Sequence, residues 1–411
     1  MENRVKRFTK LFPWHHGLIG DLLFYVAIDT LFLTVVKNFS AAEIVSLTSL
    51  SQIVCIGLQF PILFVIKKIG NTASVRTGGV LILLSSILIT FGPSYIAVLL
   101  GRILHDAAVI FKSASIVMLE NNLDLVNNRR DFVRLRTKAN TVYAVITMII
   151  SFVASFMFNL NNYFPMICCI VACFLGFVLT LFMKDYSAYD KISRKTEEKK
   201  KIKISFSSTV VMIVVVYAIF YTIVNNGQNE GKLFIQEQLM LDFNVEVTAL
   251  VIGVVVSISR IVRVFSNIVF AKLYEKYDSK MGVALPILLA ISIALLFFGS
   301  LLPSVYAKIP VMTVGYIIIL FSRDPFNIYI QDILFQSTPK EQHQMLLTIL
   351  TLSIKIAGAA FGLVFSAILL GYPLVVVIAI MLVIAIIEIV LSMILYSAVM
   401  RGKENLTSSD I

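Results

Sequence analysis

Charged residues lie inside long apolar segments of this 411-residue chain, and they define the chemistry that it could perform. The set is Asp21, Asp29, Arg102, Asp106, Lys112, Arg260, Arg263, Arg323, Asp324, Lys355 and Glu388. An ionised group at a bilayer centre costs roughly 2.5 to 3.5 kcal/mol, so the whole set exposed to lipid would cost on the order of 30 kcal/mol. We therefore expect these side chains to face one another or water around an internal polar space. An internal polar space of this kind indicates a protein through which a solute passes.

Helix geometry predicts two ion pairs in the first half of the chain. At about 1.5 Å per residue, Asp29 and Arg102 reach the same depth on antiparallel first and fourth spans. Asp21 and Lys112 lie nearer one membrane surface, and we expect them to form a second pair that gates access. Fixed ion pairs that only define helix register are the structural alternative.

Three residues of this half are candidates for proton coupling, namely Asp29, His105 and Asp106. His105 and Asp106 lie between the two predicted pairs. A proton taken up by a carboxylate would break one pairing and favour another, so transport would be coupled to protons.

In the second half of the chain, basic residues outnumber acidic residues at the same depth in the membrane. Arg260, Arg323 and Lys355 are predicted to line the polar space together with Asp324, which would neutralise Arg260 or Arg323. Because the guanidinium fork fits a carboxylate or phosphate, an anionic or zwitterionic substrate is favoured. Arg263 lies near the end of its span, and we expect it to be a boundary or loop-binding residue.

A polar, glycine-containing stretch at residues 225–231 predicts a break toward the external end of the seventh span. Interrupted helices serve transporters as gates and binding elements. The alternative is a span that ends near Val224 and continues as an ordinary loop. The predicted substrate contacts here are Tyr221, Asn225, Asn226 and Gln228, with Tyr25 on the first span.

Composition sets the class of protein. With 58% hydrophobic residues, 14% charged residues and a mean hydropathy of +0.90, the chain is predicted to be a polytopic helical membrane protein. The alternation that marks a membrane barrel is missing. All four cysteines fall inside apolar spans, which argues against disulfides and zinc, and we expect no cofactor.

Twelve spans are predicted, in two halves. They are Trp14–Val36, Glu43–Ile66, Arg76–Gly92, Tyr95–Leu119, Ala139–Leu160, Phe164–Met183, Phe206–Phe234, Val247–Leu273, Met281–Leu302, Val311–Phe335, Met345–Leu370 and Pro373–Tyr396. Residues 1–184 form the predicted first bundle, 185–205 a basic cytoplasmic linker and 206–411 the second bundle.

Basic loop residues predict the orientation. Apart from Lys37, Lys232 and Lys308, they fall on one side, so both termini and the linker are expected in the cytoplasm. The net charge of +11 follows from this topology and gives no reason to invoke nucleic acid. We expect a monomer in a bacterial cytoplasmic membrane, with the lipid bilayer, a small-molecule substrate and a proton or other coupling ion as partners.

Several motifs resemble those of the major facilitator superfamily. Gly101–Ala108 is similar to its fourth-helix signature, although Asp106 stands where Gly is usual, and the third, sixth and ninth spans are uncharged. Lys67, Lys68 and Gly70 resemble its gating loop with the acid replaced, and the equivalent loop of the second half has Glu275 and Lys276. The resemblance implies an all-α membrane fold of two pseudo-symmetric six-helix bundles around a central cavity, a functional Arg102, and gating by these two loops.

These expectations favour a secondary transporter that works by alternating access. The drug-antiporter and sugar-porter motifs are absent, so no subfamily is assigned. An exporter or flippase of amphiphilic or lipid-linked molecules is the first alternative, and a transport-dead sensor is the second. The chain lacks HExxH and Gly-x-Ser-x-Gly motifs, which argues against an enzyme.

Overall fold

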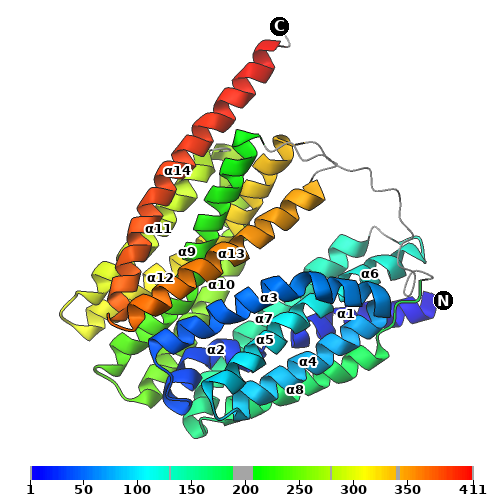
Figure 1. Cartoon of the computed structure of the whole chain (residues 1–411), viewed down its shortest axis with the longest axis horizontal. Coiled ribbons are helices and arrows are strands. Elements are labelled where there is room, and N and C mark those ends of the chain that lie inside the picture. The colour runs from blue at the N-terminus through cyan, green and yellow to red at the C-terminus, as the bar shows by residue number, and fades with distance from the viewer. Residues whose placement is uncertain (1, 129–130, 188–206, 278–279, 339–342, 410–411) are drawn as a thin grey trace. The chain divides into compact units, whose positions relative to one another are not determined.

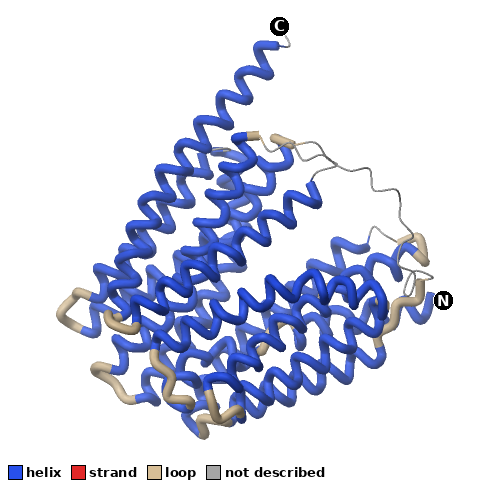
Figure 2. The backbone as a smooth tube through the Cα atoms, viewed as in Figure 1, coloured by secondary structure: helices blue, strands red, loops and turns tan. Residues whose placement is uncertain are grey.

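The computed structural model describes residues 2–128, 131–187, 207–277, 280–338 and 343–409. Every regular element in these ranges is a helix (Figure 2). Eleven helical segments are long and apolar enough to cross a membrane. The predicted all-α membrane fold is therefore confirmed.

The chain divides into two compact units. Unit 1 comprises Met1–Lys199 and Ala249–Ser257, and unit 2 comprises Lys200–Thr248 and Ile258–Ile411. The predicted linker, residues 185–205, lies outside the described residues from 188 onward.

The helices of each unit run through it as a bundle (Figure 1). The first eight and their π-helical extension η1 are α1 (Glu2–Ile19), α2 (Leu23–Leu31), η1 (Phe32–Val36), α3 (Ala41–Ile69), α4 (Asn71–Phe91), α5 (Tyr95–Lys112), α6 (Ala114–Asp124), α7 (Asp131–Leu160) and α8 (Phe164–Phe182). The others are α9 (Ser208–Met240), α10 (Val245–Tyr277), α11 (Met281–Ser300), α12 (Val305–Gln336), α13 (His343–Leu369) and α14 (Leu374–Ser409).

Two predicted spans are interrupted, which corrects the expectation of continuous helices. The first is broken between α1 and α2, where the Asp21 carboxylate accepts a hydrogen bond from the backbone N–H of Leu22 at 2.8 Å. Such a local bond competes with the helical pattern. The fourth is interrupted at Ser113, between α5 and α6, and the three charges of α5 keep it from the apolar segments found in the described residues.

The seventh span, by contrast, has no break. α9 is continuous from Ser208 to Met240, so the predicted interruption at 225–231 is wrong, and so is the alternative of a span ending near Val224. A Cβ at Gly227 would lie 3.1 Å from Ile319 Cδ1, and one at Gly231 would lie 3.2 Å from Leu296 Cδ1. These glycines therefore allow α11 and α12 to approach α9, and this packing outweighs their low helix propensity.

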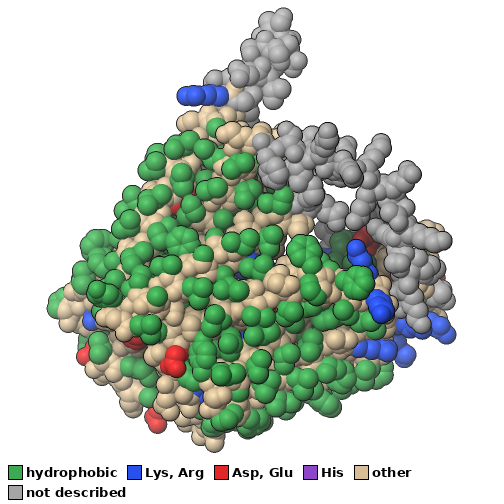
Figure 3. All heavy atoms as spheres, viewed as in Figure 1, with side chains coloured by type: hydrophobic (Ala, Val, Ile, Leu, Met, Phe, Trp, Pro, Cys, Tyr) green, Lys and Arg blue, Asp and Glu red, His purple; other side chains and the backbone are tan. Residues whose placement is uncertain are grey.

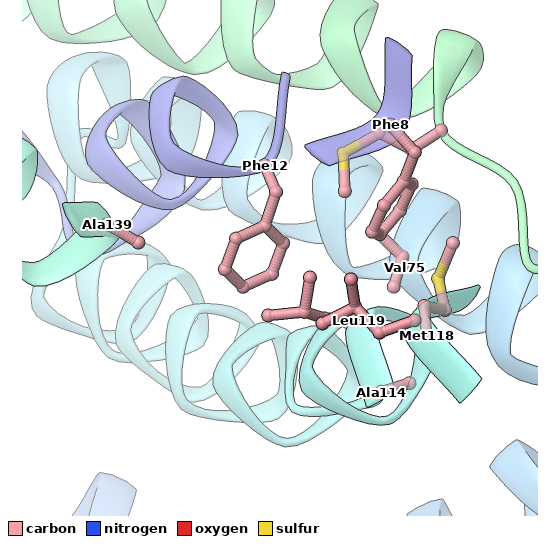
Figure 4. Packing of buried hydrophobic residues seen from close by; sticks show 9 residues of the cluster. Phe8, Phe12, Val75, Ala114, Met118, Leu119 and Ala139 are labelled. Carbon is pink, nitrogen blue, oxygen red and sulfur yellow. The ribbon is translucent and has the colours of Figure 1, made fainter. Parts of the chain in front are cut away.

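Unit 1 has an apolar core beneath α1. Phe8 and Phe12 of α1 pack against Val75 of α4 and against Met118 and Leu119 of α6 (Figure 4). All five side chains are buried. This contact explains why the helix begins at Glu2 rather than at the predicted Trp14, because the basic N-terminal segment also presents an apolar face.

Apolar side chains cover much of the face shown in Figure 3. Phe60 and Phe64 of α3 are 73% and 70% exposed, as expected of side chains that contact lipid. Glu388 of α14 behaves differently, because it is fully buried and its Oε1 accepts a hydrogen bond from Ser392 Oγ at 3.3 Å. It faces neighbouring helices and does not snorkel to the membrane surface.

Candidate functional site

The first charged cluster of the described chain lies in unit 1 at the break between α1 and α2. Lys112, the last residue of α5, donates hydrogen bonds from its ammonium to the backbone carbonyls of Ile19 and Gly20, the second at 3.4 Å. These carbonyls end α1, where the helix dipole places partial negative charge. The ammonium therefore joins α5 to the open end of α1.

His105 stands between two carboxylates in this cluster, which we call the His105 triad. Its Nε2 lies 3.2 Å from Asp21 Oδ1, and its Nδ1 lies 3.5 Å from Asp106 Oδ1. His105 is 8% exposed, and within the described chain neither ring nitrogen makes a well-aligned hydrogen bond. An imidazole between two acids is suited to holding a proton and to passing it from one acid to the other.

Arg102 lies one helical turn before Asp106. Its guanidinium carbon is 5.9 Å from the centre of the buried Tyr25 ring, a cation–π contact. Asp29, on the same helix as Tyr25, accepts a hydrogen bond from the backbone N–H of Thr30 at 2.7 Å. The Asp29–Arg102 pair stays a prediction.

The structure gives Asp21 and Lys112 partners other than each other. Asp21 contacts His105, whereas Lys112 donates to backbone carbonyls. Counting residues along the two helices predicted that Asp21 and Lys112 lie at the same depth. It could not predict that a helix break exposes backbone carbonyls to Lys112. The two groups attract each other electrostatically without a direct ion pair in the described chain, and their gating role stays a prediction.

The second charged cluster lies in unit 2. Arg263 of α10 donates to Asp324 of α12 through Nε at 2.8 Å and through Nη2 at 2.9 Å, a two-point ion pair. The sequence prediction of a boundary or loop-binding role for Arg263 is therefore wrong. Asp324 was expected to neutralise Arg260 or Arg323, but it pairs with the arginine nearer the end of α10.

Arg323 has a neutral partner. Its Nη1 donates to Gln228 Oε1 of α9 at 2.8 Å, and Tyr221 donates to the backbone carbonyl of Arg323 at 2.7 Å. Within the described chain Arg323 forms no ion pair with a carboxylate. Arg260 and Arg263 lie within electrostatic range of it. Asp324, which pairs with Arg263, also lies within electrostatic range of Arg323.

The sequence analysis missed Tyr217, Asn327 and Gln331. Tyr217 donates to Asn327 Oδ1 at 2.7 Å, and Gln331 donates to the same oxygen at 3.0 Å. With Arg323, Asn327 and Gln331 repeat every four residues and so occupy one face of α12. That spacing could have identified them.

The other predicted substrate contacts fall in unit 2. Asn225 and Lys355 are half-buried on α9 and α13, and Arg260 is half-buried on α10. Asn226 is 8% exposed, and within the described chain its Nδ2 makes no hydrogen bond.

The predicted gating loops lie at helix ends. Gly70 has a φ of 84°, a conformation that favours glycine, and it separates α3 from α4. Lys67 and Lys68 are exposed in the last turn of α3. Glu275 and Lys276 are exposed at the end of α10.

Within the described residues, no group of three His, Cys, Asp or Glu side chains is arranged to hold a metal ion.

The sequence matches a known family model, described as the Major Facilitator Superfamily, over residues 18–334. No curated protein matches the chain.

Solved transporter structures share the fold along nearly the whole chain. The nucleoside transporter NupG is 14% identical, with a TM-score of 0.73 and coverage of 97% of this chain and 99% of that one. A bacterial homologue of the iron transporter ferroportin is 12% identical, with a TM-score of 0.70 and coverage of 95% and 99%. A bacterial homologue of the human lysosomal transporter Spinster is 11% identical, with a TM-score of 0.72 and coverage of 98% of each chain.

Proposed function

The chain belongs to the major facilitator superfamily, as its fourth-span and loop motifs predicted, and from this premise we propose a specific transport function. The protein is a secondary transporter that moves a small anionic or zwitterionic solute across a membrane. Transport occurs by alternating access and is coupled to protons.

The arginine cluster of unit 2 is the observation that supports an anionic or zwitterionic substrate. Arg260 and Arg263 both lie within electrostatic range of Arg323, and Asp324 already holds Arg263 at two points. Arg323 is left with an amide partner, Gln228. A substrate carboxylate or phosphate would replace the weaker amide contact with a charge-assisted one.

Proton coupling is supported by the His105 triad. A proton on His105 would form charged contacts with both Asp21 and Asp106, and its loss would leave two carboxylates facing a neutral ring. Asp21 lies at the break between α1 and α2, so a change in this contact would act directly on a discontinuous helix. Helices of this kind serve transporters as binding and gating elements.

Purified protein in proteoliposomes that contain a pH-sensitive dye tests the proposal. The solutes would be a sugar phosphate, a dicarboxylate, an amino acid and, because one fold relative is a nucleoside transporter, a nucleoside. At least one of the first three should enter together with protons. Arg323→Gln should slow this uptake by about tenfold or more, the equivalent of about 1.4 kcal/mol.

Asp106→Asn separates coupling from binding. This variant should still exchange labelled for unlabelled solute but should not accumulate solute along a proton gradient. Lys6→Gln, at an exposed position of α1, is the matched control and should leave both activities unchanged. Undiminished accumulation by Asp106→Asn would remove this residue from coupling.

The same preparation separates the alternative functions. Redistribution of a headgroup-labelled lipid without solute uptake would indicate a flippase or an exporter of amphiphilic molecules. Binding of a solute without any flux would indicate a sensor. Either result would contradict the proposed transport of a small polar solute.

A further inference from the structure

The contact between Lys112 and the end of α1 resembles an ion-binding site that is occupied by a side chain. The last carbonyl groups of a helix have no partner within that helix, and in a membrane protein they cannot be left without one. The Lys112 ammonium binds the carbonyls of Ile19 and Gly20, and it also attracts the adjacent Asp21 electrostatically. One positive charge therefore serves three oxygen-bearing groups.

The packing around Lys112 is shaped for its side chain. A Cβ on Gly78 of α4 would lie 3.0 Å from Lys112 Cγ and 3.2 Å from the Lys112 backbone nitrogen. Only glycine at this position gives the lysine stem its full space. Lys112 is also the last residue of α5, so its stem lies against α4 while its ammonium binds the end of α1.

Asp21 adds the carboxylate that such a site needs. In the described chain its hydrogen bond from Leu22 and its contact with His105 both use Oδ1, which leaves Oδ2 for a cation. The side chain is 33% exposed, so an ion could reach it from water. Carbonyl oxygens at the end of a broken helix, together with a carboxylate, are the ligands that transporters present to Na⁺.

We propose that the Lys112 ammonium occupies a monovalent-cation site formed by the carbonyl oxygens of Ile19 and Gly20 and by the Asp21 carboxylate. A chain that lacks this side chain binds Na⁺ there instead. The natural protein consequently needs no Na⁺ at this position. The ion site does not depend on the transport function proposed above. Its consequence for the choice of coupling ion does rest on that function.

Thermal unfolding of the purified full-length protein in detergent, in NaCl or in choline chloride, tests the proposal without a known substrate. The natural protein should have the same Tm in both salts. Lys112→Ala should have a lower Tm than the natural protein in choline chloride. Na⁺ should then raise that Tm by at least about 2 °C, with a saturating dependence on Na⁺ concentration.

Lys112→Met is the matched control, because it removes the charge but fills the space with an apolar stem of similar length. It should be destabilised to a similar degree and should not respond to Na⁺. Asp21→Asn combined with Lys112→Ala should abolish the Na⁺ effect.

Lys112→Ser, which also leaves room for an ion, replaces the alanine variant if that variant does not fold. The proposal is overturned if the small variants show no effect specific to Na⁺. It is also overturned if the methionine variant or the natural protein responds equally. The assay measures ion binding rather than flux, so its outcome is independent of whether any solute is transported.

Discussion

At the residue scale, the two-point contact between Arg263 and Asp324 sets the stability of the arginine cluster. Arg263→Ala should leave the Asp324 carboxylate without its guanidinium partner. The side chains are 30% and 27% exposed, so we expect a loss of about 1–3 kcal/mol, below the roughly 3–5 kcal/mol of a fully buried pair. Thermal unfolding in detergent measures it.

Two further variants distinguish the charge from the geometry of this pair. Arg263→Lys keeps the charge but loses the fork, so its stability should fall between those of the natural protein and Arg263→Ala. Replacing both residues with leucine removes the charges together and should restore most of the lost stability. Equal loss in the single and double variants would show that the ion pair is not the cause.

At the element scale, the surroundings of a glycine show whether two helices pack closely at that position or whether the position is open. A Cβ at Gly315 of α12 would lie 2.6 Å from the backbone oxygen of Ser292 on α11, an atom that cannot rotate away. Gly315→Ala should therefore push α11 and α12 apart and destabilise the protein by about 1–3 kcal/mol. Thermal unfolding gives the size of the loss.

Gly57 of α3 is the matched control for this prediction. A Cβ there would have no atom within 4 Å, and the residue also lies inside a helix. Gly57→Ala should leave stability unchanged or raise it by up to about 1 kcal/mol through helix propensity. A similar loss in both variants would mean that backbone effects, rather than helix contact, cause the destabilisation.

A buried carboxylate and the side chain of Asn122 hold the segment that follows α8 against the helices of unit 1. Asp185 is 1% exposed and accepts hydrogen bonds from the side-chain amides of Asn71 at 2.9 Å and Asn121 at 2.8 Å. Asp185→Asn replaces an acceptor by a donor and should destabilise unit 1 by about 1–3 kcal/mol. Glu2→Gln, which breaks an exposed pair with Lys6, should change the Tm little if at all.

The positions of the helix breaks show what apolar periodicity can and cannot predict. It located the membrane segments other than the fourth, because their length and composition are fixed by the bilayer. It placed the break in α9, where glycines and amides cluster, but Gly227 and Gly231 serve helix packing there. The actual break at Asp21 depends on one side-chain bond and on a lysine from another helix.

The same limit applies to the choice of partners within the candidate site. The predicted depth in the membrane placed Arg260, Arg323 and Asp324 in one region. The structure brings the two arginines within electrostatic range of each other. The predicted depth could not assign Asp324 to Arg263, since that depends on the rotation of α10 and α12 about their own axes. Rotation is set by packing, which one sequence does not reveal.

At the scale of the whole molecule, the basic residues predict how the chain is oriented in its membrane. Lys68 lies beside Lys67 in the last turn of α3, within the basic set assigned to the cytoplasm. Asn162 lies in the short connection between α7 and α8, three crossings after Lys68 along the chain, and this odd number puts it on the opposite side. Both positions are exposed.

Single cysteines at these two positions make the orientation measurable. The four natural cysteines are buried or half-buried in the helical bundles, so they contribute little labelling background. Asn162→Cys should react with a membrane-impermeant maleimide in intact cells, whereas Lys68→Cys should react only after the membrane is permeabilised. The reverse pattern would place the basic loops outside. Because the helices that connect these loops are fixed in the fold, it would also reverse the side from which Asp21 meets water.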